Sequence, residues 1–454
     1  MSDYQDAQKV TPLAEDGAGI SIVLAKEQQE SPKISLSVEI SAGLTTFLSM
    51  AYVMSVNPII LSGAGMDIQA LFTATVLGVI LATVLMAAIA KLPFAVAPGM
   101  GLNAFFVVIA TTMGFTWQQA LTAVLISGIL FVAISFSPLR EKVIREVPKS
   151  LQHAVAAGIG IMIAHIGLFN AKIAVTSPIG QYSLGVLTQG PGLLAIIGLA
   201  ITGILLALRI KFALLLGIII TTLIGIPLGV TDTSLVAQKG FISAPASIAP
   251  IAFHFDFSIL TSWTFWGIVF TLLFMEVFDG LAGFIGLFTV MGSDSKFYRP
   301  RLGKAFIADS LGVVAGACVG VSPNTTYAES GSGIANGGRT GITALTVAVL
   351  FALCLLFSNL FLTVPSSAVA PALIMVGLLM TTSLQELNFS DITETFPAFV
   401  IVVVIAFTLR ISDGLALGWI LFIIMKLLAR KREELTTTVW VVGAIFLLKI
   451  ILVD

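Results

Sequence analysis

Charged residues are scarce in this sequence. Only 10% of its 454 residues are Asp, Glu, Lys or Arg, whereas 57% belong to the apolar set and the mean hydropathy is +1.05. Soluble domains usually carry about 25% charged residues. The composition therefore excludes a soluble protein and predicts a chain that lies within a lipid bilayer.

Cysteine and histidine are also rare, with two cysteines inside apolar runs and three scattered histidines. This pattern argues against a disulfide framework, a zinc site or a haem site. The formal net charge of -1 provides no basic field that could hold nucleic acid. No phosphate-binding loop or dinucleotide fingerprint is present. We therefore expect no cofactor and no nucleic-acid partner, but lipid and a small solute.

What is present is a nearly continuous series of apolar stretches. A membrane-spanning helix needs about 20 predominantly apolar residues, and the sequence predicts fourteen such segments. They cover 38–60, 68–90, 92–113, 117–137, 149–170, 190–208, 212–232, 264–291, 304–320, 324–338, 340–363, 366–383, 394–410 and 413–429. A last apolar stretch, 439–453, is short and contains Lys449, so we expect it to be packed or interfacial.

The basic residues predict the orientation of these segments, because cytoplasmic loops hold an excess of Lys and Arg. With both termini inside, nineteen of the 23 basic residues face inward and only Lys172, Lys239 and Arg410 face outward, with Lys449 set aside. The polar, acidic residues 1–37 lack the pattern of a cleaved signal peptide and are predicted to form a disordered cytoplasmic tail. We expect a multi-pass protein of the plasma (inner) membrane.

A short internal match indicates a duplicated plan. Leu208-Arg209-Ile210 recurs as Leu409-Arg410-Ile411, and Val147-Pro148 at the start of segment five resembles Val364-Pro365 at the start of segment twelve. Partner segments are then seven apart. Because seven is odd, the second half is predicted to lie upside down relative to the first, as in many transporters.

Segments three and ten do not have the pattern of plain helices. Segment three contains Ala97-Pro98-Gly99 followed by Asn103, and segment ten contains Ser322-Pro323 followed by Glu329. Proline and glycine weaken a helix, and broken backbone at membrane depth survives only when it is buried in protein or lines a cavity. The two segments are therefore predicted to break near mid-membrane and to face one shared site through their half-helix ends.

Ionisable residues within the spans are the second signal, since they are costly there and usually functional. Glu276 and Asp279 are three residues apart and share a helix face. Two close carboxylates cannot easily both ionise, so one of them is expected to exchange a proton. Glu329 adds a third acid, whereas Asp309 fits either a hydrogen bond to the broken segment or a coupling role. Phe105 can stack on a flat ligand or simply pack in the core.

Three runs together resemble the nucleobase:cation symporter-2 family, in its hypoxanthine-adenine-guanine permease branch. They are Gly43-Leu44-Thr45-Thr46-Phe47-Leu48-Ser49-Met50-Ala51-Tyr52-Val53-Met54-Ser55-Val56-Asn57-Pro58, the Ala-Pro-Gly-Met-Gly-Leu-Asn-Ala-Phe-Phe motif at 97–106 and the Thr-Thr-Tyr-Ala-Glu-Ser-Gly-Ser-Gly-Ile motif at 325–334. The resemblance spans roughly residues 39–426. It implies an all-α polytopic fold of two inverted seven-segment repeats, with short strands in segments three and ten.

The resemblance also implies two domains and a function. A core domain would comprise 38–137 (segments one to four) and 264–363 (eight to eleven), and a gate domain 149–235 (five to seven) and 364–429 (twelve to fourteen), followed by a cytoplasmic or interfacial segment, 430–454. The expected activity is import of adenine, guanine or hypoxanthine together with a proton, in preference to sodium, by alternating access. The expected assembly is a homodimer held through the gate domain.

The resemblance assigns roles to individual residues. Three residues stand at the family's substrate-binding positions: Asn103, Glu276 and Glu329. We add three further candidates for substrate binding, which are Phe105 and the two residues next to Glu329, namely Ala328 and Ser330. Asp279 stands at the acid tied to proton coupling, with Asp309 as a second candidate. Some relatives have aspartate where Glu276 stands, which leaves the purine preference open.

Two other functions fit the architecture less well. An anion transporter or channel would need a positive site, whereas this sequence places acids without a basic partner in its spans. A membrane-embedded hydrolase with paired carboxylates would not need fourteen spans in inverted repeats.

Overall fold

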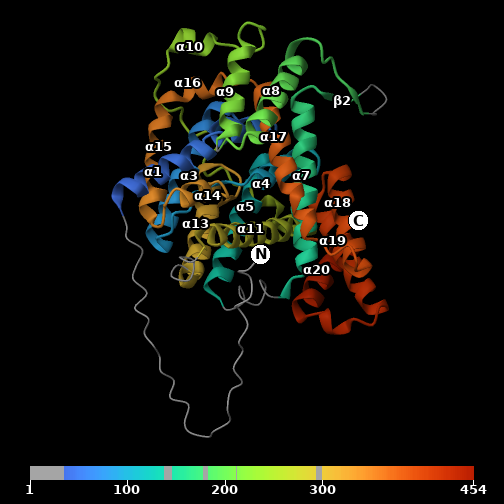
Figure 1. Ribbon diagram of the computed structural model, residues 1–454. Coiled ribbons are helices and arrows are strands. Elements are labelled where there is room, and N and C mark those ends of the chain that lie inside the picture. The colour runs from blue at the N-terminus through green and yellow to red at the C-terminus, as the bar shows by residue number, and fades with distance from the viewer. Residues whose placement is uncertain (1–34, 138–145, 177–181, 211, 293–298, 454) are drawn as a thin grey trace, which may run out of the picture. The chain divides into compact units, whose positions relative to one another are not determined.

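The computed structural model describes residues 35–137, 146–176, 182–210, 212–292 and 299–453 (Figure 1). The predicted tail over 1–37 lies almost entirely outside these ranges, and so do five basic residues of the predicted inward loops. These five are Arg140, Lys142, Arg145, Lys211 and Lys296.

Helices make up most of the described chain. In the first half they are α1 (Leu36–Met50), α2 (Val53–Ser62), α3 (Ile68–Leu85), α4 (Met100–Thr111), α5 (Trp117–Phe136), α7 (Lys149–Asn170), α8 (Gly190–Ala207), α9 (Ala213–Gly225) and α10 (Ser234–Lys239). In the second half they are α11 (Trp263–Met291), α13 (Leu302–Val319), α14 (Ser330–Ala335), α15 (Gly341–Cys354), α16 (Ser358–Leu362), α17 (Ser366–Thr381), α18 (Ile392–Thr408), α19 (Ile411–Leu428) and α20 (Thr437–Val453).

Four short strands form two antiparallel pairs in the described residues. Strands β1 (Val96–Pro98) and β4 (Asn324–Thr326) pair with each other across the two halves of the chain. Strands β2 (Ala174–Thr176) and β3 (Tyr182–Leu184) pair locally as a hairpin. The hairpin was not predicted, because its residues resemble an ordinary loop between two apolar segments.

Ten stretches of the described chain are long and apolar enough to cross a membrane. Three further predicted spans correspond to the shorter apolar helices α4, α9 and α18. Predicted segment ten, 324–338, consists of β4 and the six-residue helix α14, so it is no continuous helix. The chain is a mostly helical, polytopic membrane protein, and the count of fourteen segments stays a prediction.

The first predicted span, 38–60, is divided into α1 and α2 by a tight turn at Ala51 and Tyr52. Within this turn the amides of Met54 and Ser55 bond to carbonyls three residues back, at Ala51 and Tyr52. The sequence did not indicate the turn, since both of its residues are apolar or aromatic. Tyr52 therefore lies at the break between α1 and α2.

Helix contacts come in matched pairs. In the predicted repeat, α1, α3 and α15 correspond to α11, α13 and α5. Helix α1 packs on α15, and its counterpart α11 packs on α5. Helix α3 also packs on α15, and its counterpart α13 packs on α5. In the same way, α8 packs on α9 and α17, while α18 packs on α19 and α7. A repeat of seven segments predicts such pairs, and the inversion of the second half stays a prediction.

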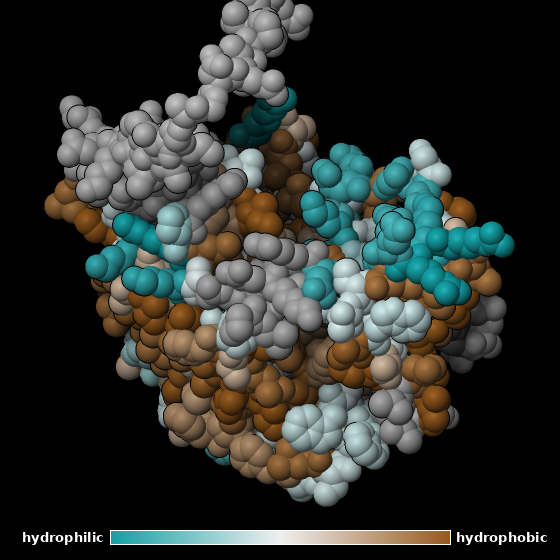
Figure 2. All heavy atoms as spheres, turned by 90° about the horizontal axis from the view of Figure 1, so that it is seen from below, coloured by the Kyte–Doolittle hydropathy of each residue, from teal (hydrophilic) through white to brown (hydrophobic). Residues whose placement is uncertain are grey.

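The surface agrees with a bilayer environment. Figure 2 shows hydrophobic residues over much of the visible face, with hydrophilic residues gathered in separate groups. Phe399 on α18 is 62% exposed and Phe407 is 79% exposed. Helix α20, over the stretch predicted to be packed or interfacial, packs on α19 and α11, and its Val439 and Phe446 are buried.

Candidate functional site

The centre of the fold is the pairing of β1 with β4. Val96 pairs with Thr326, Ala97 with Thr325 and Pro98 with Asn324. The prolines favour extended backbone in the residues before them, Ala97 and Ser322. Two more bonds extend the ladder, from the Gly99 amide to the Pro323 carbonyl (3.0 Å) and from the Tyr327 amide to the Ala95 carbonyl (2.9 Å).

Side chains from neighbouring helices bond to the open edges of these strands. The Thr83 hydroxyl on α3 donates to the Val96 carbonyl (3.0 Å) and accepts from the Val96 amide (3.1 Å). The Ser330 hydroxyl accepts from the Ala95 amide at 2.9 Å. Backbone groups at membrane depth need partners within the protein, and these bonds supply them. Broken backbone is therefore stable at this position.

Asn324 inserts between α3 and α13 and holds β4 in place. Its Nδ2 atom donates to the Gly312 carbonyl on α13 at 2.8 Å. Gly316 makes this approach feasible, because a Cβ atom there would lie 2.6 Å from the Asn324 Nδ2 atom. The Thr326 hydroxyl adds a bond to Asp309 Oδ1 at 3.0 Å. Strand β4 is thus attached to α13 at two points.

A cavity of about 560 Å³ adjoins the paired strands. One side consists of Gly99–Gly101, 325–329 and α11, and the other of α7, α9 and α17, with Tyr52 from the α1–α2 turn. Its volume falls within the range of about 300–1,000 Å³ that is typical of ligand pockets. The cavity brings together segments that are far apart in the sequence, which makes it the candidate site.

Two acidic side chains line this cavity, Glu329 and Asp279, and no basic side chain is among its described lining residues. Both acids are partly buried. The Tyr52 hydroxyl donates to Glu329 Oε1 at 2.7 Å, and the Tyr327 hydroxyl donates to the Pro98 carbonyl at 2.6 Å. Glu329 thus keeps a second carboxylate oxygen that this tyrosine does not occupy.

Both predicted half-helix ends line this cavity, through Met100 and Gly101 at the start of α4 and through Ala328 and Glu329 before α14. Helix α4 begins at Met100, and the first amides of a helix have no partner within it. Met100 and Gly101 line the cavity. At the start of α14 the amides of Ser330, Gly331 and Ser332 already bond to the carbonyls of 327–329 in tight turns.

Several predicted site residues lie outside the cavity lining. Glu276 is 1% exposed, its Oε1 atom accepts from the Ser127 hydroxyl of α5 at 2.8 Å, and its Oε2 atom has no hydrogen-bond partner in the described structure. Asn103 is fully buried, where its Oδ1 atom accepts from the Ser322 hydroxyl. Phe105 is also fully buried. Ser330 does not line the cavity, and its hydroxyl accepts from the amide of Ala95, the residue before β1.

Of the four other predicted site residues, three line the cavity and one does not. Ala328, Glu329 and Asp279 line the cavity, whereas Asp309 is fully buried behind β4. Asp309 Oδ2 lies against Gly280, where a Cβ atom would be 2.7 Å from it. Tyr52 was missed by the sequence interpretation, although a tyrosine in the middle of an apolar span is a detectable polar group.

Comparisons with known proteins show the family of this chain. The sequence profile of the permease family matches residues 37–417. The chain is 39% identical to the adenine permease AdeP of Escherichia coli strain K12 over 418 residues, which covers 92% of this chain and 93% of AdeP. The chain belongs to the nucleobase:cation symporter-2 family. It is also 39% identical to the guanine/hypoxanthine permease PbuO of Bacillus subtilis strain 168 over 433 residues, which covers 94% of this chain and 98% of PbuO.

Solved structures share the fold of this family member at low sequence identity. The transmembrane domain of the cyanobacterial bicarbonate transporter BicA matches with a TM-score of 0.61 and 16% identity, over 85% of this chain and 98% of that domain. The murine anion transporter Solute Carrier 26 family member A9, in its inward-facing state, matches with a TM-score of 0.60 and 13% identity. The match covers 88% of this chain and 69% of that transporter. The chain therefore has a transporter fold, and its family consists of permeases and not enzymes.

Proposed function

We propose that this permease carries purine nucleobases, adenine, guanine or hypoxanthine, across the membrane together with a proton. The observation that carries the proposal is the cavity beside β1 and β4, where Glu329 and Asp279 face one space without a basic neighbour in the described lining. The names of the adenine and guanine/hypoxanthine permeases to which the chain is 39% identical support the same substrate class.

The chemistry of a purine suits this cavity. Its ring N–H and amino groups are donors that a carboxylate can accept, and its ring nitrogens are acceptors for backbone amides. We propose that Glu329 accepts from the base while the first amides of α4, at Met100 and Gly101, donate to it. Apolar side chains such as Leu214 and Val376 line the cavity and suit the flat faces of the ring.

An anion is a poorer match to the same cavity. The solved neighbours of this fold carry bicarbonate or other anions according to their names. The described lining of this cavity supplies two acids and no Lys, Arg or His. A bound anion would meet repulsion from both carboxylates, so the neutral base is the better ligand.

We propose that Asp279 carries the coupling proton. It lines the cavity with Glu329, so its charge can respond both to solvent and to the bound base. Asp309 is fully buried and bonded to Thr326, which supports a role in positioning β4. Glu276, Asn103, Phe105 and Ser330 then act by positioning the helices and strands, since none of them lines the cavity.

Alternating access is the proposed transport mechanism. The cavity has walls from α11 and the strands on one side and from α7, α9 and α17 on the other. Movement of a gate domain containing the latter helices against a core domain would open the cavity to each side in turn. The two-domain division, the homodimer, the inner-membrane location and the cytoplasmic termini belong to the same proposal.

Uptake measurements test this function. Radiolabelled adenine, guanine, hypoxanthine, xanthine and uracil are supplied to cells that lack their own nucleobase permeases, with and without a protonophore. We expect saturable uptake of at least one of the first three bases and loss of accumulation with the protonophore. Uptake of none of the purines would contradict the substrate class, and accumulation that resists the protonophore but needs sodium would contradict proton coupling.

A further inference from the structure

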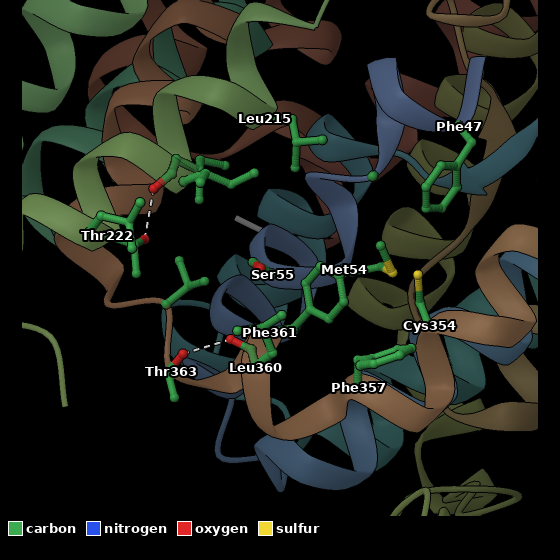
Figure 3. Close-up of a pocket in the computed structure, with 15 residues that line it drawn as sticks. Phe47, Met54, Ser55, Leu215, Thr222, Cys354, Phe357, Leu360, Phe361 and Thr363 are labelled. Carbon is green, nitrogen blue, oxygen red and sulfur yellow. Dashed lines mark hydrogen bonds between the residues drawn. The ribbon is translucent and has the colours of Figure 1, made fainter. Parts of the chain in front are cut away.

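A second cavity is lined almost entirely by apolar side chains. It has a volume of about 420 Å³ and is shown in Figure 3. Its walls come from α1 and α2, from α9, and from α15, α16 and the turn between them. Met54, Leu215, Cys354 and Phe361 are among the side chains that surround it. We name it the apolar cavity.

Two of the three hydroxyl groups in this wall bond to nearby backbone carbonyls. Thr222 donates to the Ile218 carbonyl and Thr363 to the Leu360 carbonyl, both at 2.7 Å (Figure 3). The remaining hydroxyl, that of Ser55, belongs to a residue that is only 5% exposed, and no described lining residue is charged. Water gains little in such a space, since a buried water needs two to four polar partners. The cavity therefore suits a hydrocarbon better than water.

The position of the cavity indicates where that hydrocarbon comes from. Ile219 and Leu223 on α9 are 44% and 58% exposed, and Leu360 on α16 is 44% exposed. These lining residues belong to apolar helices of a membrane-spanning protein, so their exposed sides meet lipid. The apolar cavity is thus continuous with the bilayer-facing surface. Lipid is the apolar material that is always present there at high concentration.

The apolar cavity shares two walls with the candidate site. Ala51 lines the apolar cavity, and its neighbour Tyr52 lines the candidate site and donates to Glu329. On α9, Leu215 lines the apolar cavity and Leu214 the candidate site. An occupant of the apolar cavity therefore touches both the α1–α2 turn and α9.

We propose that the apolar cavity binds the acyl chain of a membrane lipid, which packs between α9 and the helices α2, α15 and α16. The acyl chain supplies the dispersion contacts that these walls otherwise lack. It thereby holds α9 in a defined position relative to the α1–α2 turn. This inference does not depend on which solute the protein carries.

Photo-crosslinking tests the proposal. The full chain is reconstituted into vesicles of phosphatidylcholine with a diazirine in one acyl chain, irradiated and digested, and the adducts are located by mass spectrometry. We expect adducts concentrated on α2, α15 and α16 at the cavity. Leu215→Trp fills the cavity and should remove these adducts, whereas Leu353→Trp, on α15 outside the cavity and 53% exposed, should leave them unchanged. Adducts spread evenly over all lipid-facing helices, and unaffected by Leu215→Trp, would mean annular lipid only and would overturn the proposal.

A native thiol gives a second measurement that needs no bulky substitution. The chain has two cysteines, so Cys318→Ser leaves Cys354 in the cavity wall as the single thiol. We expect N-ethylmaleimide to label Cys354 several times more slowly in phosphatidylcholine vesicles than after lipid removal. Equal labelling rates in the two preparations would contradict occupancy of the cavity by an acyl chain.

Discussion

Tyr52 and Glu329 meet across 277 residues of sequence, and their hydrogen bond shows how individual residues define the candidate site. The tyrosine occupies Oε1 of the carboxylate and thereby orients the side chain in the cavity. A carboxylate with one oxygen held and one available presents a defined acceptor to a ligand. We expect the site to depend on both members of this pair.

Replacement of Glu329 by glutamine should weaken binding of the base. Hydrogen bonds to charged groups contribute about 1.5–3 kcal/mol, so the affinity should fall roughly 10- to 150-fold. Binding of radiolabelled adenine or guanine to purified protein measures this change. Glu276→Gln is the matched control, because Glu276 bonds to Ser127 outside the cavity lining and its replacement should leave affinity nearly unchanged. Equal losses in both variants would place the ligand elsewhere.

Tyr52→Phe removes only the hydroxyl that holds Glu329. This hydroxyl acts on the base only through Glu329, so the loss should be smaller than for Glu329→Gln, about 0.5–1.5 kcal/mol. The Km for uptake should then rise roughly 2- to 10-fold while the amount of protein in the membrane stays normal. Tyr182→Phe, in the exposed strand β3, serves as the control. An unchanged Km in Tyr52→Phe would remove this tyrosine from the site.

Asp279→Asn tests the coupling role. If Asp279 carries the proton, the amide should still bind the base, as measured by ligand-induced thermal stabilisation, but should abolish pH-driven accumulation, since its charge cannot change. The two readouts separate the alternatives. Loss of both would make Asp279 a substrate-binding residue, and retained uphill uptake would assign the proton to Glu276, Glu329 or Asp309.

Sequence reasoning recognised the acids at the residue scale but not which of them face the cavity. Glu276 and Asp279 are three residues apart on α11, so helical geometry places both on the same face of the helix. The position of α5 separates them, because Ser127 bonds to Glu276 while Asp279 is left facing the cavity. Such a choice depends on the packing of distant helices, which a local pattern cannot reveal.

At the scale of elements, the broken segments could be predicted and their pairing could not be derived from the residues alone. Pro98 and Pro323 are local signals that stop a helix. The register of Val96 with Thr326 also depends on Asn324, which reaches the Gly312 carbonyl, and on Thr83, which bonds to Val96. The resemblance to a known family supplied the expectation of short strands, and the structure contains them.

Gly316 tests how closely α13 must approach β4. A Cβ atom there would lie 2.6 Å from Asn324 Nδ2, so Gly316→Ala should displace the amide and lower stability by about 1–3 kcal/mol. Gly286→Ala, on α11, is the control, because a Cβ atom there meets nothing within 4 Å. Thermal unfolding in detergent compares the two variants. A midpoint for Gly316→Ala at or above that of the unaltered protein would show that β4 does not need this contact.

At the scale of the whole molecule, charged groups form a network where α18, α19 and the turn before α20 meet. Lys426 on α19 has no exposed side-chain surface and contacts Asp391 at 3.7 Å and Glu394 at 3.1 Å, as well as Glu434. Lys431 bonds to Asp391 at 2.5 Å. The network connects three successive elements of the second half.

This network predicts a dependence of stability on pH. The hydrogen bond from Lys431, followed by that from the Thr393 side chain, lowers the pKa of Asp391 well below its ordinary value of 3.8. A carboxyl with a lowered pKa stabilises the fold above its unfolded-state pKa and loses that contribution as the pH falls toward the folded-state value. The difference in thermal midpoint between the unaltered protein and Asp391→Asn should therefore be largest near neutral pH and shrink below about pH 4. A difference that is constant from pH 7 to pH 3 would contradict this account.

The pairing of β1 with β4 has a consequence for the biosynthesis of the protein. Val96 and Thr326 are 230 residues apart, and a ribosome that adds about 5–20 residues per second needs roughly 10 to 50 seconds to make the second strand after the first. During that time β1 has no partner strand, and bare backbone is unstable in hydrocarbon. The nascent first half must therefore be sheltered until its partner emerges. A ribosome that stops before residue 324 leaves a membrane fragment with an exposed strand edge, which quality-control proteases can recognise.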